Sequence, residues 1–205
     1  MEIVPRSQRE DYLILSSPLL ILFPAMMFAL GQKKAAFIIF LSFLFFLRSP
    51  DRKLFSKNAT QVYSPADGVV ERIDIFEKYI RVSIYLNIFD CHIQYIPIDG
   101  SIIEQKYIKG RFHPAYQLVK SDYNERLETH MKTTNGEDIF IVQIAGQLAR
   151  RINSFVTPSD KVNTGEKLGV IKFGSRVDVY LPISANVKVR VSDRVSGATD
   201  VIATI

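Results

Sequence analysis

The chain has 205 residues, a formal net charge of +5 and a hydrophobic share of 47%, which is enough for one modest domain. Its single cysteine, Cys91, excludes an internal disulfide and a metal cluster built from cysteines, and it fits a reducing, cytoplasmic-side setting. The basic balance favours residence against anionic lipid headgroups. Nucleic acid is the usual alternative, but no basic run interleaved with aromatic residues supports it, so we expect no nucleic-acid partner.

The N-terminal part, residues 12–47, is almost entirely apolar and is interrupted only at residues 31–34. The first run, Tyr12 to Leu30, has roughly the ~20 residues that span a bilayer, whereas Ala35 to Leu47 has the length of an interfacial or re-entrant segment. The stretch is too long for a secretory signal and lacks a cleavage site. We therefore expect residues 1–50 to form a membrane-anchoring helical hairpin.

Two features of the expected hairpin bear on its placement. Pro18 and Pro24 lie in the first run, so a kinked or shallow helix is as plausible as a straight one, and the depth stays open. Basic residues at the two ends outnumber those at the tip, which predicts that both ends face the cytoplasm at the cell membrane. These residues are Arg6, Arg9, Arg48, Arg52 and Lys53 at the ends, and Lys33 and Lys34 at the tip. The alternative is a long hairpin buried in a core.

After Pro50, short runs of Val, Ile and Tyr alternate with Gly, Pro, Asp and Asn, which is typical of strands and turns. We expect residues 51–205 to form a mainly β catalytic domain. The expected strands are Gly68–Ile75, Tyr79–Tyr85, Gly100–Tyr107, Ile139–Ile144, Lys167–Phe173, Arg176–Tyr180 and Asn186–Val191. Residues 145–152 are either a short helical turn or a strand.

Two turn sequences occur twice in this domain. Residues 64–68 and 96–100 are both Pro-x-Asp-Gly turns, and residues 159–165 have a counterpart in 192–197. This spacing resembles the hammerhead hairpins of biotinyl and lipoyl carrier domains, which implies a flattened β-barrel or sandwich. The carrier lysine is missing. The simplest interpretation of the other aspartates is a structural role in turns, at Asp99, Asp160 and Asp193.

A Gly-Ser pair, Gly174-Ser175, lies between two hydrophobic runs, residues 170–172 and 177–180. Because glycine has no Cβ, the peptide before the serine can bend towards an attack geometry at low steric cost. Attack of the serine hydroxyl on the Gly174 carbonyl would give an ester, and β-elimination would then break the chain. Hydrolysis of the resulting dehydroalanine leaves a pyruvoyl group on Ser175. Taken alone, such a pair is more often an ordinary turn.

Together, several motifs resemble the short, archaeal-type phosphatidylserine decarboxylases over nearly the whole chain. They are residues 45–52, 64–68, 90–92, 124–126, 143–146, 149–151 and 173–178. The resemblance implies self-cleavage between Gly174 and Ser175 into a β chain of residues 1–174 and an α chain of residues 175–205 that remain associated. It also implies a covalent pyruvoyl cofactor derived from Ser175, and it requires no metal.

The resemblance implies roles for three further residues. Asp67 corresponds to an acidic residue that orients or deprotonates a histidine, which in turn activates Ser175. His92 is the best candidate for this histidine, since imidazole exchanges protons near neutral pH. Asp90 could support the same proton relay, although strand alternation alone would place it on the same face as His92. Larger relatives have a second histidine where this chain has Tyr95, so either His92 acts alone or Tyr95 contributes its hydroxyl.

The implied reaction is the decarboxylation of phosphatidylserine to phosphatidylethanolamine through a Schiff base with the pyruvoyl group. Basic side chains at Arg150, Arg151 and Arg176 could hold the phosphodiester or the carboxylate, or could simply be solvent-facing. His113 and His130 lie outside the family motifs and are expected to be surface residues. Selectivity between ester and ether lipids, and assembly into a homo-oligomer, stay open.

Two other classes of protein remain as alternatives. In the first, a membrane-anchored adaptor has hammerhead hairpins and no enzymatic activity, and its chain stays intact. In the second, a serine-lysine membrane peptidase also combines apolar N-terminal helices with a β-rich body, but no convincing serine-lysine pair follows the apolar region.

Overall fold

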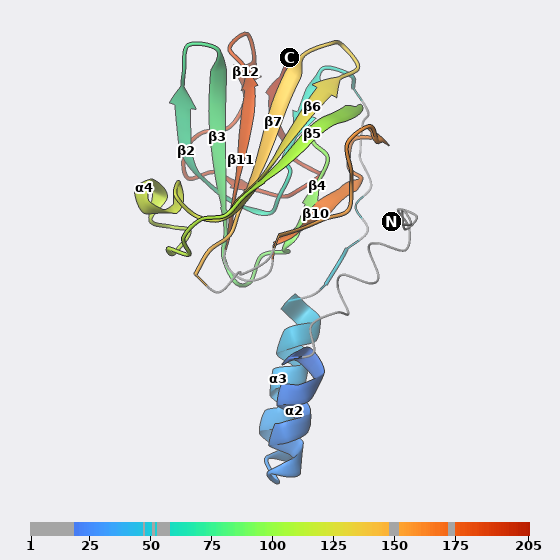
Figure 1. Ribbon diagram of the computed structural model, residues 1–205, viewed down its shortest axis with the longest axis vertical. Coiled ribbons are helices and arrows are strands. Elements are labelled where there is room, and N and C mark those ends of the chain that lie inside the picture. Colours follow the sequence, from blue (N-terminus) through green and yellow to red (C-terminus); the bar gives the residue numbers. More distant parts are fainter. Residues whose placement is uncertain (1–18, 47, 51, 53–57, 148–151, 172–174) are drawn as a thin grey trace. The chain divides into compact units, whose positions relative to one another are not determined.

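The computed structural model describes the chain except residues 1–18, 47, 51, 53–57, 148–151 and 172–174 (Figure 1). The chain divides into two compact units, Met1–Pro50 and Asp51–Ile205.

The described part of the first unit contains two helices, α2 (Leu19–Ala29) and α3 (Lys33–Phe46), which pack side by side (Figure 1). The turn between them is closed by Gly31, whose φ of +77° suits glycine and whose N–H donates to the carbonyl of Phe28 at 3.0 Å. Most of the large apolar side chains on both helices are exposed. Among the described residues, no helix is both long and apolar enough to cross a bilayer.

The second unit is built from strands, with one short helix, α4 (Leu118–Ser121). The strands in the first half are β1 (Gln61–Tyr63), β2 (Gly68–Ile75), β3 (Tyr79–Leu86), β4 (Ile93–Tyr95), β5 (Gly100–Ile108) and β6 (Arg126–Thr133). Those in the second half are β7 (Asp138–Ile144), β8 (Ile152–Ser154), β9 (Lys161–Val162), β10 (Lys167–Ile171), β11 (Ser175–Pro182), β12 (Asn186–Val187), β13 (Arg194–Val195) and β14 (Val201–Thr204). The prediction of a mainly β unit is confirmed.

The strands form three antiparallel sheets. The largest has eight strands in the order β13-β2-β3-β11-β7-β6-β5-β9, and it curls into a half-barrel (Figure 1). The two smaller sheets have the orders β1-β14-β12 and β4-β10-β8. Strand β11 lies in the middle of the large sheet between β3 and β7, and seven of its eight residues are buried. Its buried positions therefore include polar and charged side chains, Ser175, Arg176 and Asp178, as well as apolar ones.

The two repeated turns of the sequence form equivalent structures. The N–H of Tyr63 donates to the carbonyl of Pro97 at 2.9 Å, and the N–H of Tyr95 donates to that of Pro65 at 2.8 Å. Similarly, Asp160 accepts from the N–H of Thr157 at 2.8 Å, as Asp193 does from that of Arg190 at 2.7 Å. Ser159 and Ser192, the residues before these aspartates, both have positive φ. The expected turn roles of these two aspartates are confirmed.

Six of the seven predicted strands have a counterpart of similar extent in the structure. The expected strand Asn186–Val191 is limited to β12, because the chain then enters the turn at Ser192. The unexpected strands are β1, β4, β6, β9, β13 and β14, of which β6 is long and alternates in burial along its length. Of residues 145–152, Ile152 begins β8, while residues 148–151 lie outside the described part of the chain.

Candidate active site

Ser175 is the first residue of β11 and is fully buried. It pairs with Leu86, the last residue of β3, while the preceding strand β10 ends at Ile171. The Oγ atom of Ser175 has no hydrogen-bond partner among the residues that the structure describes. A buried hydroxyl without a partner is costly and calls for an explanation.

His92 lies at the end of the connection from β3 to β4 and is buried. Its carbonyl accepts from the N–H of Ile171, the last residue of β10, at 3.3 Å. Leu86, the last residue of β3, pairs with Ser175, the first residue of β11. The residues that flank the β3–β4 connection therefore lie beside those that flank the β10–β11 connection. The ring atom Nδ1 lies 2.9 Å from the carbonyl oxygen of Asp90. Because a carbonyl only accepts, Nδ1 carries a proton, and in the neutral ring Nε2 is then the atom that can take up a proton.

The carboxylate of Asp90 fixes the turn that leads to His92. It accepts from the N–H of Asn87 at 2.8 Å through Oδ2, and it forms an ion pair with Arg194 through Oδ1. The N–H of Phe89 also donates to the side chain of Asn87, at 2.8 Å. Asp90 therefore contacts His92 through its backbone carbonyl, and its carboxylate holds the turn in place.

Asp67 lies in the turn before β2, at the same end of the sheet. Its carboxylate forms a two-pronged ion pair with Arg52, with both N–O distances 2.6 Å, and accepts from the N–H of Gly197 at 2.8 Å. The next residue, Gly68, lies against Tyr85, so Asp67 and Ser175 flank the end of β3 from its two neighbouring strands. Two strand spacings of about 4.8 Å separate the backbones of β2 and β11 there.

Tyr95, the residue that replaces the second histidine of larger relatives, is buried beside this ion pair. The guanidinium of Arg52 lies over its ring, 5.3 Å from the centroid. Burial, and then the charge of Cys91, raise the pKa of the Tyr95 phenol well above its usual value. The side chain is therefore a neutral phenol near neutral pH, able to donate or accept a hydrogen bond but not to act as a base.

Comparisons with known proteins identify the family of the chain. A family model described as phosphatidylserine decarboxylase matches residues 39–203. The chain belongs to the phosphatidylserine decarboxylase family. It is 39% identical to the phosphatidylserine decarboxylase proenzyme of Rickettsia bellii over 95% of this chain and 88% of that protein. It is 37% identical to the proenzyme of Parabacteroides distasonis, over 81% and 79% of the two chains.

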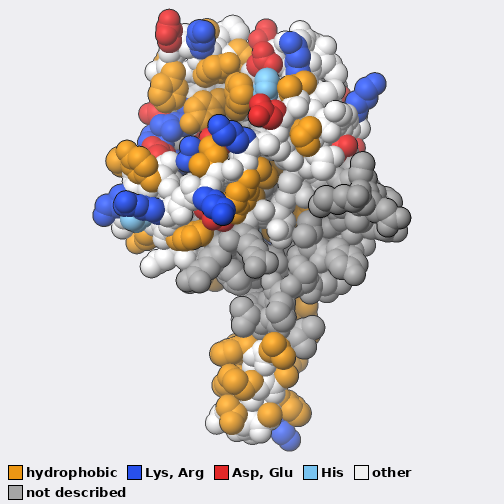
Figure 2. All heavy atoms as spheres, viewed as in Figure 1, with side chains coloured by type: hydrophobic (Ala, Val, Ile, Leu, Met, Phe, Trp, Pro, Cys, Tyr) orange, Lys and Arg blue, Asp and Glu red, His pale blue; other side chains and the backbone are white. Residues whose placement is uncertain are grey.

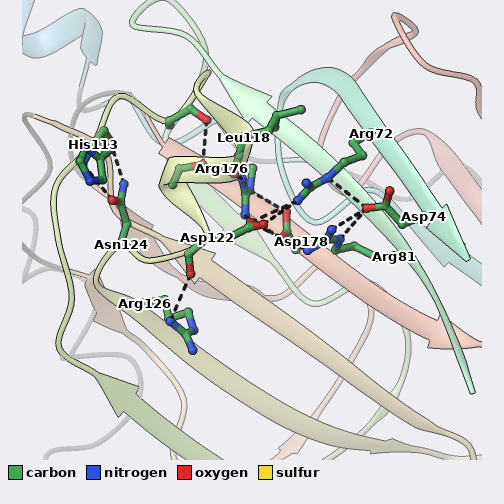
Figure 3. Close-up of polar contacts among 12 residues, drawn as sticks. Arg72, Asp74, Arg81, His113, Leu118, Asp122, Asn124, Arg126, Arg176 and Asp178 are labelled. Atoms are coloured by element: carbon green, nitrogen blue, oxygen red, sulfur yellow. Dashed lines mark hydrogen bonds and ion pairs between the residues drawn. The ribbon is translucent and has the colours of Figure 1, made fainter. Parts of the chain in front are cut away.

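In this family member, Arg176 is fully buried beside Ser175 in sequence (Figure 3). Its guanidinium donates to Ser121 Oγ at 2.6 Å and to the Leu118 carbonyl at 3.1 Å, and it pairs with Asp122 and Asp178. Successive residues of a strand point to opposite faces, so these contacts lie on the face opposite the Ser175 hydroxyl. They hold α4 against the sheet, and the expected contact of Arg176 with substrate stays a prediction.

The ion pairs continue on that face to Arg81 and Asp74, as Figure 3 shows. A pocket of about 360 Å³ opens there, lined mainly by charged and aromatic side chains, among them Arg81, Arg126, Phe140 and Tyr180. Burial raises the pKa of the Asp178 carboxyl, whereas hydrogen bonds and the charge of Arg176 outweigh burial at Asp122 and lower its pKa. The pocket is therefore part of a structural charge network.

The remaining predicted residues are placed as follows. Gly174, Arg150 and Arg151 lie outside the described residues. His130 is partly exposed and pairs with Asp138 at 2.8 Å, and His113 is tied through its backbone to the buried Asn124. Sequence reasoning gave no role to Arg194 or Asp122, whose partners Asp90 and Arg176 lie 104 and 54 positions away.

Proposed function

We propose that this chain is a self-processing phosphatidylserine decarboxylase of the short, archaeal-type subfamily, which forms phosphatidylethanolamine and carbon dioxide. The observation that carries the proposal is that the Ser175 hydroxyl is buried and has no hydrogen-bond partner among the described residues, in a chain that belongs to this family. Its cofactor is a pyruvoyl group derived from Ser175, and this site suits that group because it already encloses a small polar atom.

Cleavage begins when Ser175 Oγ attacks the Gly174 carbonyl carbon and the peptide C–N bond breaks, which leaves an ester and a free amine. Removal of the Ser175 α-proton then breaks the bond between Cβ and Oγ and releases the Gly174 carboxylate. Water replaces the nitrogen of the resulting dehydroalanine and ammonia leaves. The products are a β chain of residues 1–174 and an α chain of residues 175–205.

His92 is the proton acceptor in this sequence, because its Nδ1 contact leaves Nε2 as the basic atom of the neutral ring. Asp90 positions His92 by holding the preceding turn. Asp67, which lies at the same end of the sheet, is the acidic residue that acts on His92. Tyr95 contributes a neutral hydroxyl at most, since its phenol stays protonated. His92 therefore serves both the cleavage and the turnover.

In turnover, the pyruvoyl group supplies a carbonyl that withdraws the electrons left when carbon dioxide departs. His92 holds and returns the proton that the α-carbon of the substrate needs. Arg150 and Arg151 provide guanidinium groups suited to a phosphodiester or a carboxylate, which guanidinium pairs with two-pronged geometry. The two chains stay together because β11 keeps its ladders with β3 and β7 when the chain is cut before it.

The helical hairpin of residues 1–50 anchors the enzyme at the cytoplasmic face of the cell membrane, with anionic phospholipid as its surroundings. The exposed apolar side chains of α2 and α3 support this proposal, since such faces are unfavourable in water. The paired turns of the β unit support a flattened barrel with hammerhead hairpins like those of biotinyl and lipoyl domains.

Denaturing electrophoresis tests the proposal. The purified chain should run as two fragments split before Ser175, and the small fragment should resist Edman degradation because its N-terminus carries no amine. Ser175→Ala should stay as one inactive band. Ser83→Ala, which alters another fully buried serine of the same sheet, should be cleaved as in the unmodified chain. An intact chain would favour the adaptor alternative, and an active Ser175→Ala variant would refute the assignment.

A further inference from the structure

The turn that leads to His92 presents two apolar side chains to solvent. Ile88 is 54% exposed and Phe89 is 68% exposed, although both follow directly on the buried end of β3. The turn is held by Asp90 and Asn87, so the two side chains are kept outward by specific hydrogen bonds. Exposed apolar side chains that gather on one surface are typical of an interaction site.

A second apolar group lies on the segment 109–123 around α4. Its exposed side chains are Phe112, Tyr116, Val119 and Tyr123, and Val119 reaches 74% exposure. Residues 109–123 also include Lys109, Arg111 and Lys120 against one acidic residue, Asp122, which pairs with Arg72 and Arg176. The segment is therefore apolar, aromatic and basic together.

The two groups lie at the same end of the unit as Ser175. The rings of Tyr85 and Tyr116 meet edge to face, 6.5 Å apart, and Tyr85 is two residues before Asn87. Arg176, the neighbour of Ser175, holds α4 through Leu118 and Ser121. Figure 2 shows hydrophobic side chains interleaved with Lys and Arg at the edge of the unit where α4 lies in Figure 1.

We propose that the β unit has its own membrane-docking surface, which enters the headgroup layer of an anionic bilayer. This docking surface consists of Ile88, Phe89, Phe112, Tyr116, Val119 and Tyr123. It rests on the proposed function, because the substrate lipid lies in that bilayer and Ser175 lies at the same end of the unit. It is separate from the helical hairpin, which belongs to the other unit.

The chemistry of the surface favours a bilayer over a second protein chain. Tyrosine and phenylalanine rings favour the boundary between headgroups and acyl chains. Lysine and arginine lay their aliphatic stems along apolar surface while their charges reach the lipid phosphates, and anionic leaflets attract them. The basic excess of residues 109–123, whose one carboxylate is already paired with arginines, is complementary to an anionic surface and repels a second copy of the same segment.

Tryptophan fluorescence tests this proposal, because the chain contains no tryptophan. Phe89→Trp and Val119→Trp place a reporter on the docking surface of the full chain. Ile75→Trp is the matched control, since Ile75 is 75% exposed at the other end of β2 and β3, about 20 Å away at 3.4 Å per residue. On vesicles of phosphatidylcholine and phosphatidylserine with brominated chains, the first two reporters should shift to the blue and be quenched, and the control should not.

Equal quenching at all three positions would overturn the docking surface. A blue shift of Phe89→Trp that grows with protein concentration in the absence of vesicles would assign the surface to a second copy and would also overturn it.

Activity separates failure of docking from failure of the proposed function. The double variant Phe89→Ser/Val119→Ser should lose about tenfold or more of its rate on phosphatidylserine in vesicles. It should keep the unmodified rate on short-chain phosphatidylserine dissolved as monomers. An equal loss on both substrates would contradict docking. If the unmodified chain decarboxylates neither substrate, the proposed function fails while the fluorescence result still decides on the surface.

Discussion

Replacing Arg176 with methionine should destabilise the β unit strongly. The Arg176 side chain is fully buried, and its removal leaves the buried Asp178 with Arg81 at 3.9 Å as its nearest cation among the described residues. Breaking a buried ion pair by removing one partner costs about 3–5 kcal/mol, because the other charge stays desolvated. At about 2–4 °C per kcal/mol for a unit of this size, the melting temperature should fall by about 6–20 °C.

Circular dichroism during heating of the full chain in detergent measures this loss. Arg126→Met is the matched control, since Arg126 on β6 of the same sheet pairs with the partly exposed Glu128, and such pairs contribute about 0–1 kcal/mol. The double variant Arg176→Met/Asp178→Asn should recover much of the stability, because no buried charge is left without a partner. If Arg176→Met melts within 2 °C of the control, about 1 kcal/mol or less, the buried network does not hold the fold.

Three further predictions follow from individual residues. Gly68→Ala should block folding and cleavage, because the added Cβ would lie 2.1 Å from the Tyr85 carbonyl oxygen. In the control, Gly136→Ala, the added Cβ meets no atom within 4 Å, so the free energy of unfolding should fall by only about 1 kcal/mol. Electrophoresis compares the cleavage of the two variants, and thermal melting compares their stability. Tyr95→Phe should leave the shape of the cleavage-rate profile from about pH 6 to about pH 9 unchanged, since the phenol stays protonated throughout; an altered limb would make Tyr95 a proton carrier. The pKa of Asp122 is lower in the folded chain than in the unfolded chain, where it is about 3.9, so the ionised carboxylate stabilises the fold above that pH. This contribution to stability is lost as the pH falls. Asp122→Asn should therefore lose less stability than the unmodified chain below about pH 4 in acid titrations.

The sequence predicts those strands whose pattern is local. Strand β2 has the expected bounds, and β11 was found because its run of Val and Tyr after Gly174 is typical of a strand. Strand β6 was missed because two of its buried positions are threonines, Thr129 and Thr133. Burial alternates along the strand, but apolar and polar residue types do not alternate clearly, so the sequence lacks the usual strand pattern.

The candidate site was predictable only in part, and the reason lies in sequence distance. Ser175, His92 and Asp67 belong to motifs that can be read in short windows. Arg194 and Asp122 do not, because each acts through a partner that the fold brings from far along the chain. The spacing of Asp90 to His92 left a proton relay and a structural role both open. The structure shows the Asp90 carboxylate bonded to the turn before His92, and the relay stays a prediction.

The burial of Ser175 also bears on what kind of cleavage this fold can tolerate. Simple hydrolysis before Ser175 would leave an ammonium group at the start of a central strand, at a residue with no exposed surface. An ionised amine buried without a partner is strongly unfavourable, and the new terminus would be driven out of the sheet. A pyruvoyl terminus carries no charge and can remain where the serine was, so that β11 keeps its pairs with β3 and β7. The same burial that makes the hydroxyl costly in the precursor therefore makes an uncharged carbonyl the compatible product.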